Sequence, residues 1–108
     1  MIKIVNKKKY WGPGFLVDRS TFLGNKWSHL KGTKAEFLVA TRDEACDKYD
    51  EWLEEELKQD GHAKELFDVL CEHYRENHEL ILICCCVPER CHAESIAKQI
   101  EKRIQNHQ

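Results

Sequence analysis

Apolar and polar positions follow two different periods along the chain, and these periods predict its main elements. Residues 80–86 form an unbroken apolar run of strand length. Such a run is typical of a strand buried on both faces, as in a parallel sheet. A shorter apolar stretch at residues 2–5 predicts a neighbouring strand. Pro88 cannot donate to a ladder, so the longer strand should end before it.

Helical spacing of apolar residues predicts three helices after the first strand. The first follows Thr41, which stands three residues before Glu44, the spacing of a capping box. The second covers about residues 62–75, beyond the Asp60-Gly61 break, and the third begins at Ala93. We therefore predict a single α/β domain over residues 1–108. It should have a small, mainly parallel sheet flanked by helices, and end in a strand-loop-helix unit.

The composition changes this picture little but narrows the classes of partner. The chain has 108 residues, 42% apolar and 33% charged, with a net charge of -2. Nucleic-acid binding usually leaves a strongly basic footprint, so we do not expect a nucleic-acid partner. Lys7, Lys8 and Lys9 form a local basic cluster that could contact a phosphate, but we interpret it as a solvated strand end. No apolar run reaches the roughly 20 residues of a membrane span, and no signal peptide is apparent, so we expect a cytoplasmic protein without a membrane partner.

Six cysteines are many for this length, yet their order does not suggest a disulfide framework. Cys84, Cys85 and Cys86 are consecutive, and consecutive side chains of a strand point to opposite faces. Cys84, Cys86, Cys91 and His92 could in principle bind zinc, but no Cys-x-x-Cys pair is present. We therefore predict no metal site, and keep a zinc-stabilised domain as an alternative.

The start of the predicted last helix carries the strongest chemical signal. Ligands of open α/β sheets bind outside the carboxyl ends of the strands. Cys91 and His92 stand there, where the helix dipole lowers a thiol pKa and attracts anions. Arg90 adds positive charge, and Glu94 could accept a proton. We expect Cys91 to act as a nucleophile or thiolate, with His92 or Glu94 as its acid–base partner.

A second candidate segment, residues 18–27, has no clear period and predicts an ordered loop. Gly24-Asn25 is a turn signal. Arg19 offers a planar fork of donors suited to phosphate or carboxylate, and Asn25 can both donate to and accept from a base or sugar. The alternative, a surface cation and a turn residue, stays open. The 19–25 loop should lie over the start of the last helix.

Three stretches in this order resemble the family catalogued as domain of unknown function 4326, common in bacteria and phages. Residues 19–27 match its first motif, with Lys26 and Trp27 where Pro-Phe is usual. Residues 42–45 and 49–53 match Arg-Asp-Glu-Ala and Tyr-x-x-Trp-Leu, and residues 84–92 match its Cys-rich strand followed by Cys-His. The resemblance implies no established activity. It implies that Arg19, Asn25, Cys86, Cys91 and His92 share a pocket, and a loose analogy with another Cys-His family favours a nucleotide or nucleoside ligand.

These observations lead to three hypotheses about function. The first is a small enzyme or binding protein for an anionic, nucleotide-like ligand at the carboxyl end of the last strand. The predicted ligand-binding residues are Arg19, Ser20, Gly24, Asn25, Cys86 and Arg90. The second is a protein-interaction module anchored by Trp11 and Trp27, and the third is the zinc-stabilised domain. The sequence names no cofactor and leaves open whether the protein is an enzyme.

Overall fold

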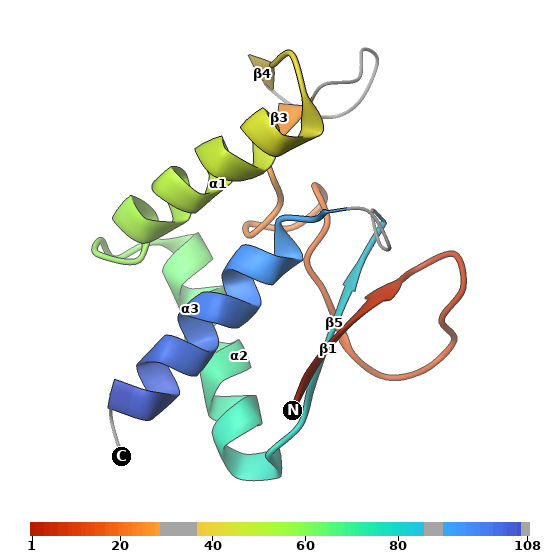
Figure 1. The fold of residues 1–108 in the computed structure, drawn as a ribbon. Helices are drawn as coiled ribbons and strands as arrows, with labels where there is room; N and C mark the ends of the chain where they lie inside the picture. The colour runs from red at the N-terminus through yellow and green to blue at the C-terminus, as the bar shows by residue number, and fades with distance from the viewer. Residues whose placement is uncertain (29–36, 86–89, 107–108) are drawn as a thin grey trace.

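The computed structural model describes residues 1–28, 37–85 and 90–106, and Figure 1 shows their arrangement. Within these ranges the chain forms five strands and three helices. The strands are β1 (Ile2–Asn6), β2 (Phe15–Leu16), β3 (Trp27–Ser28), β4 (Phe37–Leu38) and β5 (Leu80–Cys84), and the helices are α1 (Arg42–Glu56), α2 (His62–Asn77) and α3 (Ala93–Asn106).

The main sheet has the strand order β1-β5-β2, and both pairings are parallel. Ile2 pairs with Leu80 at one end of the β1–β5 ladder and Asn6 with Cys84 at the other. The predicted parallel α/β fold and the strand-loop-helix ending are thus confirmed. The sequence pattern missed β2, since it has only two residues. The sequence left residues 37–40 open as a short strand or a tether, and β4 lies within them. It missed β3, which is equally short, and therefore the separate parallel ribbon that β3 and β4 form.

Burial of β5 differs from the prediction. Leu80, Leu82 and Cys84 are fully buried, whereas Ile81 and Ile83 are only partly covered. Side chains alternate between the faces of a strand, and Figure 1 shows the described helices on one side of the sheet. The prediction of burial on both faces was therefore wrong, because the other face receives no helix in the described part of the chain. β5 also ends at Cys84, earlier than expected, and residue 86 lies outside the described ranges.

The helix boundaries follow local capping chemistry. Thr41 caps α1, because its hydroxyl accepts a hydrogen bond from the Glu44 N–H at 3.1 Å. The carboxylate of Glu44 accepts from the N–H of Ala40 at 3.2 Å, which completes a variant of the predicted capping box. α2 ends at Asn77, and its C-cap His78 lies in the left-handed region with φ of 59° and donates its N–H to the Tyr74 carbonyl.

The hydrophobic core lies between the helices and the covered face of the sheet. Its largest fully buried side chains include Tyr49, Phe67, Leu82, Ile96 and Ile100. The apolar stripes of the described helices thus share one core, in which α2 and α3 pack on β5 and α1 packs on α3. No helix in the described residues is long and apolar enough to cross a membrane.

Candidate functional site

Residues 17–26 form an irregular loop between β2 and β3, and side chains from α1 and from the residue before α3 hold it in place. The Nε2 of the buried His92, at the start of α3, bonds to the Val17 carbonyl. From α1, the Tyr49 hydroxyl donates to the Leu23 carbonyl at 2.6 Å. Asn25 of the loop donates in turn to the Ala45 carbonyl at 3.2 Å. Loop 17–26 thus contacts the start of α3 through Val17, and α1 through Leu23 and Asn25. That residues 19–25 themselves lie over the start of the last helix stays a prediction.

Arg19 and Asn25 form hydrogen bonds within loop 17–26 and to Trp27, the first residue of β3. The Arg19 Nε donates to the Asn25 carbonyl and its Nη2 to the Trp27 carbonyl, both at 2.9 Å. The Asn25 side-chain oxygen accepts from the Trp27 N–H at 2.9 Å. Because a loop lacks ladder partners, these bonds satisfy backbone groups that would otherwise stay unpaired. Their predicted role in ligand binding stays a prediction.

Ser20 and Lys7 both bind the carboxylate of Asp18. The Ser20 N–H donates to Asp18 Oδ1 at 2.9 Å and the Ser20 hydroxyl donates to the same oxygen. Lys7 Nζ lies 2.9 Å from Asp18 Oδ2. Burial alone would raise the Asp18 pKa, but the bonds from Ser20 and Lys7 together lower it to about 2. Asp18 is therefore ionised at neutral pH and fixes the first turn of the loop to the end of β1.

Cys91 and His92 form one buried unit beneath Tyr49. The Cys91 side chain is only 2% exposed, and its sulfur lies 3.5 Å from Nδ1 of His92. The Tyr49 ring meets the imidazole edge-on, with centroids 5.0 Å apart. Burial lowers the pKa of His92 to about 4, so the imidazole is neutral at pH 7. The hydrogen bond to Val17 assigns the proton to Nε2, which leaves Nδ1 to accept from the Cys91 thiol.

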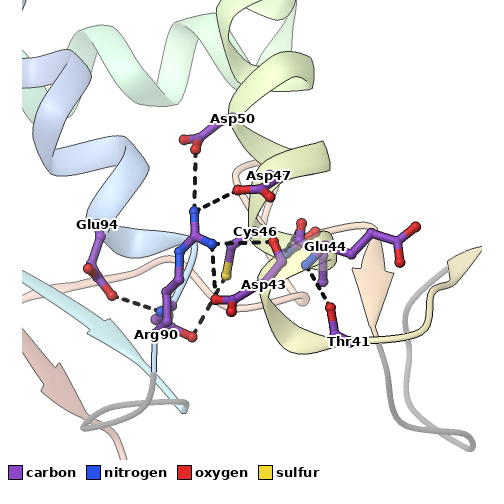
Figure 2. Close-up of polar contacts among 11 residues, drawn as sticks. Thr41, Asp43, Glu44, Cys46, Asp47, Asp50, Arg90 and Glu94 are labelled. Atoms are coloured by element: carbon purple, nitrogen blue, oxygen red, sulfur yellow. Dashed lines mark hydrogen bonds and ion pairs between the residues drawn. The ribbon is translucent and has the colours of Figure 1, made fainter.

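Arg90 and Glu94, the other two predicted site residues near α3, bind protein groups (Figure 2). Arg90 pairs with three carboxylates of α1: Asp47 at 2.9 Å, Asp43 at 3.1 Å and Asp50 at 3.7 Å. Hydrogen bonds to Asp47 and Asp43 raise the Arg90 pKa further. The Glu94 carboxylate accepts from the Cys91 N–H at 2.9 Å and so caps the first turn of α3. The contacts of Arg90 join the segment before α3 to α1.

A pocket of about 490 Å³ opens on the side of loop 17–26 that faces α1 and the start of α2. Its lining comprises Arg19, Thr21, Phe22, Gly24, Asn25, Lys26, Trp52, Glu56, Gly61, His62 and Ala63. Three predicted ligand-binding residues, Arg19, Gly24 and Asn25, are therefore in this lining. Of the other predicted site residues, the described ones do not line the pocket, and Cys86 lies outside the described ranges.

Sequence reasoning missed the other half of this pocket. Lys26 lies over the Trp52 ring, 5.2 Å from its centroid, and the Phe22 ring stacks on His62 at 4.6 Å. Gly61, the N-cap of α2, offers no side-chain acceptor to the helix N–H groups. Trp52 belongs to the apolar face of its helix, and His62 comes directly after a helix break. The sequence therefore gave neither residue a sign of a role in binding. Only the folded contact between loop 17–26 and the α1–α2 corner brings them together.

The zinc hypothesis gains no support from the described residues. Among them, no group of three or more His, Cys, Asp or Glu side chains could hold a metal ion. None of the five described cysteines forms a disulfide. Because Cys86 lies outside these residues, its contribution to a thiolate site stays a prediction.

The close backbone crossing at Gly24 predicts a large effect of one added methyl group. A Cβ at this position would lie 2.4 Å from Arg19 Cα and 2.5 Å from the Asp18 carbonyl oxygen. The Gly24→Ala substitution should lower the free energy of unfolding by about 1–3 kcal/mol in urea titrations, because backbone must shift. Gly61→Ala is the comparison variant, since its Cβ would meet only Glu56 Oε1 at 3.8 Å. It should lose less stability than Gly24→Ala, because its only cost is the preference of the α2 N-cap for glycine over alanine. Equal losses in both variants would contradict a tight crossing.

The neutral buried imidazole predicts a dependence of stability on pH. Unfolded chains bind a proton at His92 near pH 6.5, whereas the folded protein does so only near pH 4. Its contribution is complete above pH 6.5 and is lost as the pH falls towards 4. The His92→Gln variant keeps a donor for Val17 but cannot titrate. Urea titrations between pH 6.5 and 4 measure how the free energy of unfolding falls with pH. The slope for the variant should be smaller than that for the wild type by up to about 1.4 kcal/mol per pH unit. An unchanged slope would show that His92 is not buried as a neutral group.

Comparison with known proteins identifies the family. No curated protein and no solved structure shows significant similarity to the chain. A family model does match, over residues 2–102, and this range includes all three sequence stretches and every contact to loop 17–26 described above. The chain belongs to the family described as domain of unknown function (DUF4326).

Proposed function

We propose that the protein binds a small anionic ligand of nucleotide or nucleoside type in the pocket beside loop 17–26. The observation that carries this proposal is the combination of cations, aromatic rings and a helix N-terminus in one lining. A volume of about 490 Å³ suits a molecule of this size, since small-molecule sites span roughly 300–1,000 Å³.

The charged groups of the pocket suit a phosphate. Lys26 and Arg19 supply positive charge from the loop side. On the opposite side α2 begins at His62, where the helix dipole and its first N–H groups favour an anion. Glu56 is the carboxylate of the lining, and it could accept a hydrogen bond from a sugar hydroxyl or a base amine.

The aromatic groups of the pocket suit a flat ring. Phe22 is 62% exposed, an unusual position for a large apolar side chain, and it is held against His62 by stacking. Trp52 offers a second ring, with Lys26 above it. A base could stack on either ring while its phosphate contacts the cations. A nucleotide would therefore use both halves of the lining, which a simple inorganic anion would not.

This site lies away from the position expected at the carboxyl end of the last strand. It keeps Arg19, Gly24 and Asn25 but does not use Cys91, His92 or Glu94. A step that requires the Cys91 sulfur would first have to expose a side chain that is 2% accessible. We therefore propose binding, and the cysteine-based reaction is not part of this proposal.

A protein-interaction surface is the second candidate, supported by the β3–β4 ribbon. Trp27 is partly covered and stacks on Phe37, with ring centroids 5.5 Å apart. Phe37 and Leu38 are 50% and 59% exposed, so β4 presents apolar side chains to solvent. Such groups are common interface anchors, but the ribbon alone does not define a partner.

A thermal-shift series with nucleoside mono-, di- and triphosphates tests the ligand proposal. At least one should raise the melting temperature of the wild type, because a ligand that binds only the folded state stabilises it. Lys26→Gln should weaken that ligand about tenfold or more, since a charge-assisted contact is lost. Lys48→Gln, an exposed change on α1 outside the pocket, should leave the affinity unchanged. No shift with any nucleotide, or equal weakening in both variants, would contradict the proposal.

A further inference from the structure

We infer that residues 7–11, which we call the basic loop, form a separate surface that binds single-stranded nucleic acid. The basic loop follows β1 and reads Lys-Lys-Lys-Tyr-Trp. It contributes no residue to the pocket beside loop 17–26, so this surface is independent of the ligand proposed above.

The basic loop carries positive charge that the described protein does not neutralise. Lys7 pairs with Asp18, and this bond raises the Lys7 pKa. Lys8 and Lys9 are exposed, and neither forms an ion pair with another described residue. Two adjacent ammonium groups are therefore available to a polyanion, although the whole chain has a net charge of -2. A local patch can act in this way because charges beyond roughly 8–10 Å are screened at physiological salt.

The exposed indole of Trp11 is the second observation. Its side chain is 93% exposed, the highest value among the large apolar residues described. Tryptophan is buried on average, and no ring contact of Trp11 to another described residue is present. A bare indole beside two cations is the arrangement with which proteins stack an unpaired base and contact its phosphates.

Hydrogen bonds hold the basic loop in shape, so Trp11 is presented on a defined turn. The Asn6 side-chain oxygen accepts from the Lys8 N–H at 2.9 Å, and the Asn6 carbonyl accepts from the Lys9 N–H at 3.0 Å. The Tyr10 hydroxyl donates to the Pro13 carbonyl at 2.7 Å. The Tyr10 ring thereby lies close to Gly12, where a Cβ would come within 2.7 Å of its hydroxyl oxygen. The backbone of this turn is therefore ordered before binding, which lowers the entropy cost of fixing it on a ligand.

Single-stranded nucleic acid fits this surface better than other polyanions do. A duplex keeps its bases paired and stacked, so the indole would have no free base face to contact. An anionic membrane attracts lysines equally well, but stable attachment needs a broader apolar area or a second anchor. The exposed indole of the basic loop could stack on one base. The lysines of the same turn could contact the phosphates on either side of that base.

Fluorescence anisotropy with fluorescein-labelled 15-nucleotide oligo(dT) and oligo(U), at low salt, tests this inference. The wild type should bind, and Trp11→Ala should raise the Kd about fivefold or more, the effect of losing one stacked base. Trp11→Phe keeps a ring and should lose less. The Lys8→Gln/Lys9→Gln variant should reduce the slope of log Kd against log salt by about 1.4, because two phosphate contacts are removed.

The controls separate this surface from general charge and from the nucleotide pocket. Lys48→Gln/Lys102→Gln removes the same charge from exposed positions on α1 and α3 and should leave the Kd within about twofold. Lys26→Gln should not change oligonucleotide binding, whatever its effect on nucleotides. The inference would be overturned by absence of oligonucleotide binding, by equal losses in both double-lysine variants, or by a Trp11-dependent interaction with phosphatidylserine vesicles alone. Circular dichroism of each variant checks that the fold is retained.

Discussion

The need to satisfy the backbone of an irregular loop organises this protein. Loop 17–26 connects the sheet to the β3–β4 ribbon without a ladder partner over most of its length. Buried carbonyl groups without hydrogen bonds are costly, so side chains must replace the missing strand. His92 bonds to the Val17 carbonyl, Tyr49 to that of Leu23, and Arg19 to those of Asn25 and Trp27. These residues come from the loop itself, from α1 and from the position just before α3, and together they fix the course of the loop.

The same contacts explain why the three sequence stretches that gave the family resemblance occur in one chain. The first stretch is the loop itself, the second supplies Tyr49 and the Ala45 carbonyl, and the third supplies His92. Arg90 adds a further tie, because its ion pairs hold the start of α3 against α1. Groups that resemble catalytic or ligand-binding chemistry in the sequence thus hold the scaffold together. The pocket lies on the outer side of that scaffold, where Lys26 and Trp52 meet the start of α2.

Local patterns predicted the parts of the fold that local physics decides. The Thr41 cap, the start of α3 and the pairing of the two long strands all follow from spacing and residue type. The partial exposure of Ile81 and Ile83 did not, because a continuous apolar run is typical of burial on both faces, whereas the described helices cover only one face of β5. The partners of Arg90 and the lining of the pocket arise from residues far apart in the chain. The composition likewise gave only a net charge, and the sequence placed Trp11 two residues after Lys9, but the exposure of the indole needs coordinates.

The protonation state of His92 tests the loop-clamping account most directly. In protein labelled with ¹⁵N, long-range proton–nitrogen correlations of the imidazole report its charge and tautomer. If His92 holds loop 17–26, the ring at pH 7 should be neutral with its proton on Nε2, the atom that bonds to Val17. An imidazolium at pH 7, or a neutral ring protonated on Nδ1, would contradict the account. The account requires a neutral ring whose Nε2–H donates to the loop and whose Nδ1 accepts from Cys91.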